Sequence, residues 1–582
     1  MNDVRMKPKF SLLGPLDAAG ASGGFQWGSN TITDLDLEQI ALAFSVGPQY
    51  RETIKATLFN LTADARTIDY RQQVLDDFLT SNGVAAGFEE LLPILGRLHD
   101  SLNSPGKSAE LSMNETLGRL TELSTYVTCV GKLQAFLGAA GSGLHSQGLR
   151  NLRDWLDEIA ADDTFRSLET HLPELVSKLR SIPSVTIGIN LDNELRPVEA
   201  TLLSVNDKPF KGGSLLQQLM GKKTGGKQDQ GIAQLHALPY YRVDGVDNRT
   251  VRTSQRVDPM MVPLFKDLVK VVQSVISPIS SALKQYAKVN ANFLVALEEE
   301  AAFYLGAVRL IHKMQEAGLP MCRPEILPTG ERACEMQGLY NLRLALDLYN
   351  EKPELCSTVV QNELKFGPEG RIFILTGPNQ GGKTVYTQAV GIAQVLFQAG
   401  LHVPAETARI SPADGIYTHF AIEEKSIQGM GRLSEESKRL GEIFQSVTRH
   451  GLVLLNESLS STSSGESLYL AQDIVRALRL FNVRAVFATH LHELAEGVEA
   501  INREVTGDSL VVSLVAGVEL RAGQTDVDVS TDLVPRTYKI KPGPPKGHSY
   551  AKGIAVRYGI SFEQLAGQWQ ERQEPRNRKA NS

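Results

Sequence analysis

The spacing of apolar residues divides the chain into helical and strand-forming regions. From Tyr50 to about Ser181, apolar residues recur every three or four positions, which predicts a series of amphipathic helices. A shorter helix is predicted over Asp34–Phe44, with Asp34 as its N-cap. Residues 184–205 alternate in character and are rich in β-branched side chains, which indicates strands around a polar turn. Helical spacing returns over Met261–Gln315, so the pattern predicts a helical lever with an inserted tip.

Strands and helices alternate from about Gly338 onward. Apolar runs at Ile372–Leu375, at Leu452–Leu455 and just before Thr489 are typical of buried parallel strands. The predicted fold class is therefore multidomain, α plus α/β. The polar, proline-containing residues 569–582 are expected to be disordered.

Length and composition limit the class of protein. A chain of 582 residues is too long for one hydrophobic core, so at least two domains are expected. The balance of 60 basic against 66 acidic residues excludes a chain that is basic throughout, but leaves room for a local basic face. Four scattered cysteines, with no Cys-x-x-Cys pair, indicate a reduced cytoplasmic protein without a disulfide framework or structural zinc. No apolar run suggests a signal peptide or a membrane span.

A glycine-rich motif follows the first of these strands directly. It fits G-x-x-x-x-G-K-[ST], and a helical pattern begins at its end. In such a loop the glycines let backbone N–H groups surround phosphate oxygens, and the helix N-terminus adds positive potential. Lys383 is expected to reach the β- and γ-phosphates, and the Thr384 hydroxyl to bind Mg²⁺. The predicted ATP-binding residues are Gly377, Pro378, Asn379, Gln380, Gly381, Gly382, Lys383 and Thr384.

Polar residues at the ends of the next two strands are candidates for the hydrolytic chemistry. Asn456 and Glu457 follow the strand at Leu452–Leu455, where a Walker B strand would end. Glu457 can polarise the attacking water, and Asn456 can contact Mg²⁺ through water but brings no negative charge. The alternative is a strand that merely ends in polar residues. His490 can sense the γ-phosphate, although a lone histidine is more often structural.

A lysine-rich stretch lies beyond the predicted strands. Between Lys208 and Gln228 there are five lysines and no acidic residue. Two interpretations remain open, a loop that follows a phosphate backbone and a solvated surface excursion. The lysines are Lys208, Lys211, Lys222, Lys223 and Lys227.

Taken together, these motifs resemble those of the MutS family of DNA mismatch repair ATPases. The matching stretches are TGPNQGGKTVYTQAVGIAQVLFQAGLHVPA, LVLLNESLSSTS, ATHLHEL and YKIKPGPPKGHSYAKGIAVRYGIS, within about Val359–Leu565. The resemblance implies an ABC-type P-loop ATPase head that uses ATP and Mg²⁺, a helical core with levers, and a clamp at the lever tips. It also implies a homodimer through the heads that embraces double-stranded or branched DNA, with a signature loop contacting the partner's nucleotide. The candidate loop is Gly429–Leu440, with Gly431 or Ser434 at the position of the family's serine.

The resemblance divides the chain into six parts. These are an N-terminal segment (1–50), the first part of a helical core or lever (51–183), a clamp-like insertion (184–258), the second part of the lever (259–337), an ATPase domain (338–568) and the tail (569–582).

Three departures from the family pattern affect the expected function. Asn456 replaces the usual Walker B aspartate, and Leu459-Ser460-Ser461 replaces a Gly-Arg-Gly stretch. The core-like region begins near residue 35–50, which leaves no room in this sequence for a mismatch-reading domain. The one match to that domain's Phe-x-Glu wedge, Phe88-Glu89-Glu90, lies in an apolar helical pattern, and we interpret it as core.

Two functional hypotheses follow. The first is an ATP-dependent DNA-binding clamp with slow hydrolysis, acting in repair or recombination without canonical mismatch reading. The second is a nucleotide-gated dimeric scaffold that hardly hydrolyses ATP and acts through protein partners. A P-loop enzyme acting on a small molecule is disfavoured, because no second acid/base or nucleophile site is evident.

Overall fold

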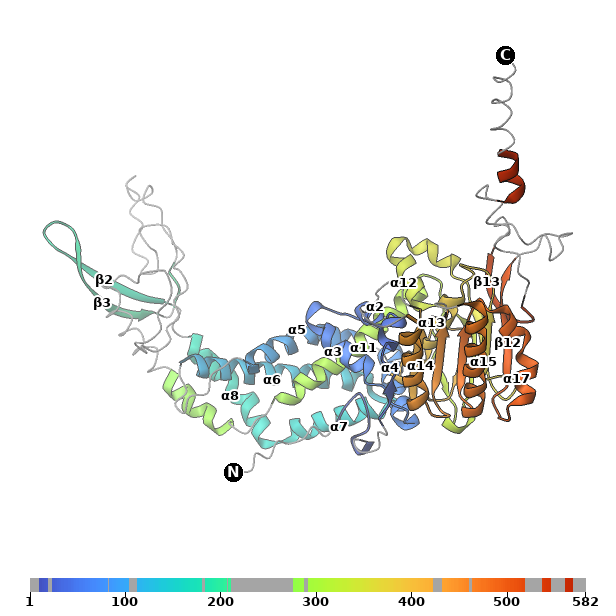
Figure 1. Ribbon diagram of the computed structural model, residues 1–582. Coiled ribbons are helices and arrows are strands. Elements are labelled where there is room, and N and C mark those ends of the chain that lie inside the picture. Colours follow the sequence, from blue (N-terminus) through green and yellow to red (C-terminus); the bar gives the residue numbers. More distant parts are fainter. Residues whose placement is uncertain are drawn as a thin grey trace, which may run out of the picture. The chain divides into compact units, whose positions relative to one another are not determined.

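The computed structural model describes twelve ranges of the chain. These are residues 10–18, 24–81, 83–103, 113–180, 184–206, 208–210, 276–286, 291–421, 432–459, 463–518, 536–545 and 561–568. Within them the chain forms two compact units. The first unit comprises residues 1–85, 142–151 and 299–582, and the second comprises 86–141 and 152–298. Helices dominate the second unit and a mixed α/β fold the first, which confirms the predicted combination of helical and α/β parts (Figure 1).

A seven-stranded sheet organises the first unit. Its strand order is β1-β9-β10-β11-β7-β12-β13, and all neighbours are parallel except the final antiparallel pair. The strands are β1 (Gln26–Trp27), β7 (Ile372–Thr376), β9 (Gly415–Phe420), β10 (Leu452–Asn456), β11 (Arg484–Ala488), β12 (Val511–Val518) and β13 (Arg536–Pro542). Every residue of β7, β10 and β11 is buried, as the apolar runs predicted.

Helices cover both faces of this sheet. Helices α14, α15 and α17 lie on one face, where their apolar side chains pack against Ile372 and Ile374 (Figure 1). Helix α13 covers the other face, and its Gly391 lies against Leu454 of β10. The helices of the first unit include α1 (Thr31–Asp34), α2 (Leu37–Ala43), α3 (Arg51–Phe59), α4 (Ala65–Thr80), α12 (Leu342–Glu351), α13 (Lys383–Gln398), α14 (Arg432–Ser446), α15 (Ser464–Phe481), α16 (His492–Glu496) and α17 (Val498–Glu504).

A smaller sheet lies in the same unit. It has the order β4-β8-β5-β6, with β4 and β8 parallel and the other pairs antiparallel. Its strands are β4 (Glu325–Ile326), β5 (Cys334–Leu339), β6 (Asn362–Phe366) and β8 (Thr407–Ile410). All four cysteines of the chain are free, in line with the absence of a disulfide framework.

The prediction for Asp34–Phe44 was wrong in one respect. Asp34 is the last residue of α1, and the next helix, α2, begins at Leu37 after Asp36, whose φ of 52° breaks the helix. Asp34 does not cap a helix because its carboxylate is used elsewhere. It accepts hydrogen bonds from Thr418 Oγ1 at 2.6 Å and from the Phe420 N–H at 3.3 Å.

Long helices make up most of the second unit. Ring contacts join Tyr126, Phe165, Trp155 and Phe293 into one aromatic cluster. The helices are α6 (Met113–Ala140), α8 (Asp163–Arg180), the stretch 276–283, and the parts in this unit of α5 (Val84–Asn103), α7 (Gln147–Ala161) and α11 (Asn292–Glu316). The helical periodicity predicted for Tyr50–Ser181 and for Met261–Gln315 is thus confirmed where the structure describes it. Phe88 is fully buried against Phe136, with ring centroids 5.0 Å apart, which supports the interpretation of Phe88-Glu89-Glu90 as core.

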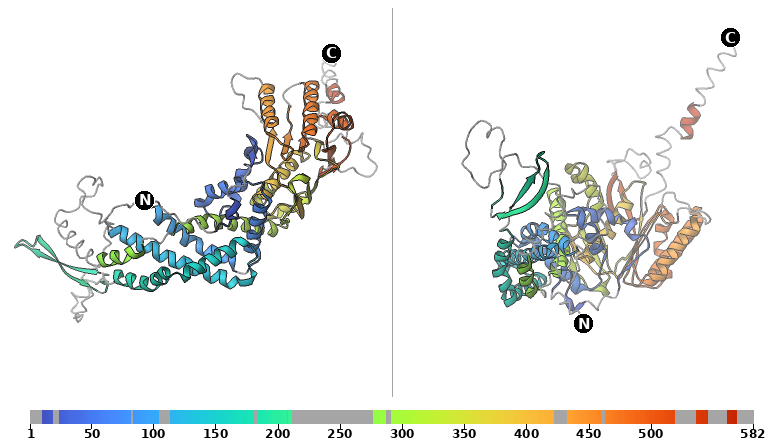
Figure 2. Two further views of the ribbon diagram at one scale, coloured as in Figure 1. Left: turned by 90° about the horizontal axis from the view of Figure 1, so that it is seen from below. Right: turned by 90° about the vertical axis from the view of Figure 1, so that its left-hand side faces the viewer.

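The strands predicted over residues 184–205 form a hairpin in the second unit. Strands β2 (Ser184–Leu191) and β3 (Pro197–Asn206) pair antiparallel and lie side by side in every view (Figure 2). The hairpin carries three acidic residues, Asp192, Glu194 and Glu199, against one basic residue, Arg196. Its exposed apolar side chains are Ile187, Ile189, Leu191, Leu195, Val198 and Leu203.

Candidate nucleotide-binding site

The glycine-rich motif forms the loop between β7 and α13. Gly377 and Gly382 have φ values of 143° and 89°, which a residue with a Cβ rarely adopts. A Cβ on Gly377 would also lie 2.7 Å from the Cβ of Ala516, so this position requires glycine for space as well. The loop and the N-terminus of α13 have the strand–loop–helix arrangement that the sequence predicts. Backbone N–H groups in such an arrangement can bind an anion.

Lys383 lies at the base of this loop. It is buried, and its Nζ donates to the carbonyl oxygens of Gly377 and Pro378 at 3.1 Å each. Burial lowers the pKa of Lys383 to about 8, because the charged amine loses its hydration. Glu457 acts to raise this pKa, and Arg536 acts to lower it. A phosphate group beside Nζ would favour the protonated form in the same way as Glu457 does.

Thr384 and Asn456 meet at the edge of the sheet. The Thr384 hydroxyl donates to Asn456 Oδ1 at 3.0 Å, and Asn456 is the last residue of β10. Both side chains offer the neutral oxygen atoms that Mg²⁺ accepts, so the pair fits a magnesium ion held mainly by nucleotide phosphates. Within the described ranges, no group of three His, Cys, Asp or Glu residues could hold a metal ion.

Glu457 and His490 form a hydrogen-bonded pair beside Asn456. Their side chains lie 2.8 Å apart, between Glu457 Oε1 and His490 Nε2, and both are partly exposed. The hydrogen bond from His490 is the main cause that lowers the pKa of Glu457, and Lys383 contributes attraction. An ionised carboxylate only accepts hydrogen bonds, so Nε2 of His490 carries the proton.

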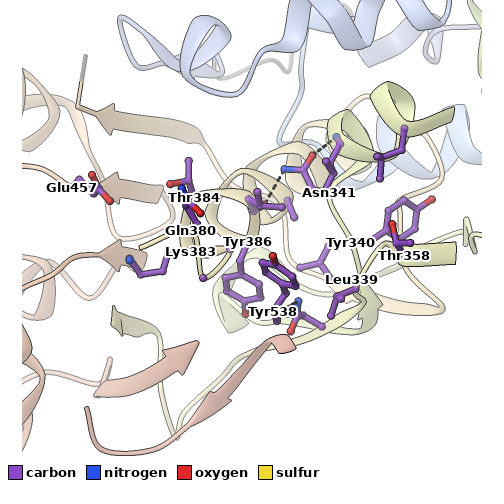
Figure 3. Close-up of a pocket in the computed structure, with 18 residues that line it drawn as sticks. Leu339, Tyr340, Asn341, Thr358, Gln380, Lys383, Thr384, Tyr386, Glu457 and Tyr538 are labelled. Carbon is purple, nitrogen blue, oxygen red and sulfur yellow. Dashed lines mark hydrogen bonds between the residues drawn. The ribbon is translucent and has the colours of Figure 1, made fainter. Parts of the chain in front are cut away.

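A cavity of about 470 Å³ extends from the loop. In Figure 3, Lys383, Thr384 and Glu457 lie at one end of the pocket and Tyr340 and Thr358 at the other, with Tyr386 and Tyr538 between them. Most of the other lining residues are apolar, namely Leu339, Leu344, Leu348, Val360, Val385 and Ala389. The rest are Asn341, Asn362 and the loop residues Gln380, Gly381 and Gly382. Beyond the loop the lining is therefore mostly apolar, with Tyr340, Asn341, Thr358 and Asn362 among its polar members.

Two residues of β13 hold this pocket together and were not predicted as site residues. The Tyr538 backbone carbonyl accepts from Asn362 Nδ2 at 3.2 Å, and its ring faces Gly382. Arg536 Nη1 donates to Gln380 Oε1 at 2.9 Å. The only sequence signal for Tyr538 was its place in the YKIKPG stretch, about 155 residues after the loop that it contacts.

Some predicted site residues fall outside the described residues. These are Gly431 of the candidate signature loop, Ser460 and Ser461, and the lysines Lys211, Lys222, Lys223 and Lys227. Ser434 is described as an exposed residue of α14. Lys208 is exposed too, and its backbone carbonyl accepts from Ser184 Oγ at 2.6 Å, which ties it to the hairpin. Among the helices that the structure describes, none has the length and apolarity that crossing a membrane requires.

The fold and the site define an α/β protein with a glycine-rich loop at the carboxyl edge of a parallel sheet, where ligand sites of such folds usually lie. Two family models match this chain, the MutS2 N-terminal domain over residues 63–317 and MutS domain V over residues 373–543. Neither is a mismatch-recognition domain. The chain belongs to the MutS family.

Curated relatives match this chain over a limited span. Endonuclease MutS2 of Thermus thermophilus is 31% identical over 222 residues, which are 38% of this chain and 27% of that protein. Endonuclease MutS2 of Streptococcus equi subsp. equi is 32% identical over 219 residues, 37% of this chain and 26% of that protein. DNA mismatch repair protein MutS of Caldanaerobacter subterraneus is 29% identical over 209 residues, 36% and 21% respectively. The matched part thus spans only about a quarter of the length of these relatives.

Proposed function

We propose that the protein is an ATP-dependent DNA-binding clamp of MutS type with slow ATP hydrolysis, acting in DNA repair or recombination without canonical mismatch reading. The observation that carries the proposal is that three adjacent parallel strands bring five polar residues together at their ends, namely Lys383, Thr384, Asn456, Glu457 and His490. Lys383, Thr384 and Glu457 line the pocket, and hydrogen bonds link Asn456 to Thr384 and His490 to Glu457. The names of the relatives support an action on DNA, since they are an endonuclease and a mismatch repair protein.

Each side chain has a role in the proposed nucleotide site. The N–H groups of Gly377–Thr384 bind the phosphates, and Lys383 turns from its loop carbonyls toward the β- and γ-phosphates. Thr384 and Asn456 would hold Mg²⁺, Asn456 through a water molecule, and the ion would supply positive charge beside the phosphates. The apolar part of the cavity accepts the nucleoside, with the Tyr538 ring as a stacking surface.

Glu457 is the proposed general base. Its hydrogen bond from His490 fixes the carboxylate and keeps it ionised, so it can take a proton from a water placed in line with the γ-phosphate. His490 acts as a positioning residue and, with its proton on Nε2, can also approach the γ-phosphate.

The larger assembly belongs to the same proposal. The first unit would supply an ABC-type head from about residue 338, and a homodimer would form with each signature loop, Gly429–Leu440, facing the partner's nucleotide. The helical unit would be the lever, and residues 184–258 the clamp at its tip. The lysines between Lys208 and Lys227 would contact DNA phosphates.

A nucleotide-gated scaffold acting through protein partners is the second candidate. Two observations favour it. Asn456 puts an amide where a carboxylate would support hydrolysis, and the described hairpin combines exposed apolar side chains with a net acidic charge, which DNA phosphates would repel.

A binding and turnover panel separates the two candidates. Duplex, branched, mismatched and single-stranded DNA are titrated at two salt concentrations with and without ATP, and turnover is measured in the same mixtures. The clamp proposal expects salt-dependent DNA binding that responds to ATP, and turnover that DNA changes. ATP binding without DNA binding and with no turnover would favour the scaffold.

A further inference from the structure

A short N-terminal segment, Asn30–Leu35, contacts two helices of the first unit that lie far from it in sequence. One is α13, which begins at Lys383 of the phosphate-binding loop. The other is α14, whose first residues form the end of the candidate signature loop. The segment follows β1, which pairs parallel to β9 as the edge strand of the large sheet.

The contacts with α13 are close. Gln388 Nε2 donates to the backbone carbonyl of Asp34 at 3.0 Å. The fully buried Leu35 side chain fills the space beside Gly391, where a Cβ would lie 2.7 Å from both Leu35 methyl carbons. Gly391 therefore allows the segment to pack directly on the helix, and a shift of α13 along its axis would move Leu35 with it.

The contacts with β9 and α14 are polar. The Asp34 carboxylate accepts from Thr418 and from the Phe420 N–H at the end of β9, and it attracts Arg439 of α14. With the Asn30 amide oriented to satisfy its neighbours, its Oδ1 accepts from Arg439 Nη2 at 2.6 Å and from Nε at 3.0 Å. Arg439 belongs to the candidate signature loop Gly429–Leu440, so the segment binds that loop's helical end directly.

The Asp34 carboxyl group is largely withdrawn from water, so losing its polar contacts would be energetically costly. Burial raises the pKa of the Asp34 carboxyl group, whereas Thr418, Arg439 and Phe420 act to lower it. A carboxylate withdrawn from water loses much of its stabilisation if its partners move away, so partners and segment are expected to move together.

The glycine-rich loop would differ between the structure and the proposed nucleotide complex. In the structure Lys383 Nζ is bonded to the carbonyls of Gly377 and Pro378. In the proposed nucleotide complex it turns to the phosphates, which changes the contacts at the start of α13. A ligand shifts a conformational equilibrium only through such differential contacts.

We propose that the Asn30–Leu35 segment couples α13 to α14, so that nucleotide binding at the loop of one subunit sets the position of its own candidate signature helix. The proposal rests on the proposed nucleotide binding. Asp34 and Asn30 are positioning residues in it, because they touch neither nucleotide nor reacting atoms. The coupling would link the nucleotide bound by one head to the surface that this head presents to a partner.

Hydrogen–deuterium exchange of the full-length protein, with and without ATP and Mg²⁺, tests the coupling. In the native protein, ATP should change amide exchange in residues 432–446 by about fivefold or more, the lower range of ordinary coupling between sites. Asp34→Asn and Asn30→Ala should keep ATP affinity within about twofold and reduce the response of α14 below about twofold.

Two matched variants separate coupling from a general loss of structure. Asn30→Asp keeps acceptor oxygens for Arg439 and should retain the response that Asn30→Ala loses. Asp36→Asn removes a nearby carboxylate that binds Arg343 of α12, and it should respond like the native protein. If Asp34→Asn does not fold, the Asn30→Ala and Asn30→Asp pair decides the question alone.

The results that overturn the proposal are distinct from failure of the proposed function. ATP binding by the native protein without any change in α14 would overturn the coupling and leave nucleotide binding intact. A native-like response of α14 in Asn30→Ala would overturn it as well. Absence of ATP binding by the native protein would remove the proposed function itself, and the coupling with it.

Discussion

His490 Nε2 lies 2.8 Å from Glu457 Oε1, although the two residues follow different strands of the sheet and are 33 positions apart. Because β10 and β11 are adjacent and parallel, both strands deliver their next side chains to the same edge. The pair is therefore a consequence of sheet topology, and it places an ionised carboxylate beside Lys383 and Asn456. This geometry makes Glu457 the side chain on which hydrolysis should depend.

Glu457→Gln should leave ATP binding within about twofold and reduce turnover by about a hundredfold or more, the ordinary range for loss of a general base. The amide has nearly the same volume but cannot accept a proton. Single-turnover hydrolysis and equilibrium nucleotide binding, measured on the same preparation, provide the test. Equal turnover in the variant and the native protein would exclude Glu457 as the base.

His490→Ala tests the pair in a different way. Without the hydrogen bond from His490 the pKa of Glu457 should rise, since that bond is the main cause that lowers it. The base must be ionised, so the acid limb of the pH–rate profile should shift to higher pH. A histidine with only a structural role would lower the rate at every pH and leave the limb where it was.

Much of the site could be predicted from the sequence because its parts are local. Gly377–Thr384 is contiguous, and Asn456, Glu457 and His490 each follow a recognisable buried strand. The position of Tyr538 in the lining of the pocket could not be predicted from spacing alone. It depends on β13 pairing with β12 and on a hydrogen bond to Asn362, which are contacts between distant parts of the chain.

The N-terminal part shows where local rules fail. Asp34 has the position and chemistry of an N-cap, but its buried contacts with Thr418 and Phe420 determine its conformation instead. Strand β1 has only two residues, too few to show any periodicity, and it exists because the edge of β9 accepts it. By contrast, the apolar residues on the buried faces of the long helices could be predicted, because the helical periodicity alone determines which face is buried.

Asn456→Asp should raise turnover and lower the Mg²⁺ concentration needed for half-maximal activity, by roughly tenfold or about 1.4 kcal/mol. The reason is that the present contact between Thr384 and Asn456 involves two neutral groups, so Mg²⁺ gains no charge attraction from this side chain. Magnesium titrations of turnover and of nucleotide binding give the answer.

Asn456→Ala is the matched control, since it removes the oxygen as well and should raise the Mg²⁺ requirement. If Asn456→Asp left the rate unchanged or lowered it, the site would be adapted to the amide, and the scaffold interpretation would gain support.

ATP affinity should fall as pH rises through about 8. The pKa of Lys383 is lowered to about 8, so the amine is mostly protonated at pH 7 and mostly neutral at pH 9. Phosphate binding needs the charged amine. Above the pKa, ATP binding must therefore include protonation of Lys383, which weakens it, so the dissociation constant of ATP should rise about tenfold between pH 7 and pH 9. Isothermal titration across this range measures the effect and the accompanying proton uptake.

Lys383→Arg carries a permanent charge and should give weaker but pH-independent binding over the same range. Lys383→Ala should abolish binding or turnover. Unchanged affinity in Lys383→Ala would disprove the assignment of the phosphate-binding loop.

The lysine-rich stretch should carry electrostatic affinity for duplex DNA. Replacing all five lysines with glutamine removes up to about five phosphate contacts, and each lost contact should flatten the log–log salt dependence by about 0.9 units. The substitutions are made at Lys208, Lys211, Lys222, Lys223 and Lys227. ATP affinity should stay the same, because these residues belong to the second unit and the glycine-rich loop to the first. An unchanged salt slope would make the stretch a solvated surface and would favour protein partners.

The protein should prefer a duplex with a single mismatch over a matched duplex by less than about tenfold. This preference corresponds to a difference in binding free energy below about 1.4 kcal/mol. A wedge that reads mismatches must unstack a base step, and it recovers that cost only where the step is already weak. Phe88-Glu89-Glu90 is the one Phe-x-Glu sequence in the chain, and Phe88 is fully buried against Phe136, so it cannot reach a base. The remaining contacts expected from the clamp are with phosphates, which carry no sequence information.

Competition between matched and single-mismatch duplexes of equal length decides this last question, with branched DNA as a third competitor. Branched DNA can still be preferred, since two arms holding a duplex respond to its geometry rather than to its bases.

The buried position of Phe88 also supplies an internal control. Phe88→Leu should lower the melting temperature by removing the ring contact with Phe136, while leaving the ratio of mismatch to matched affinity unchanged. A hundredfold preference for mismatches, or a preference that disappears in Phe88→Leu at a temperature where the variant is folded, would mean that this chain does read mismatches.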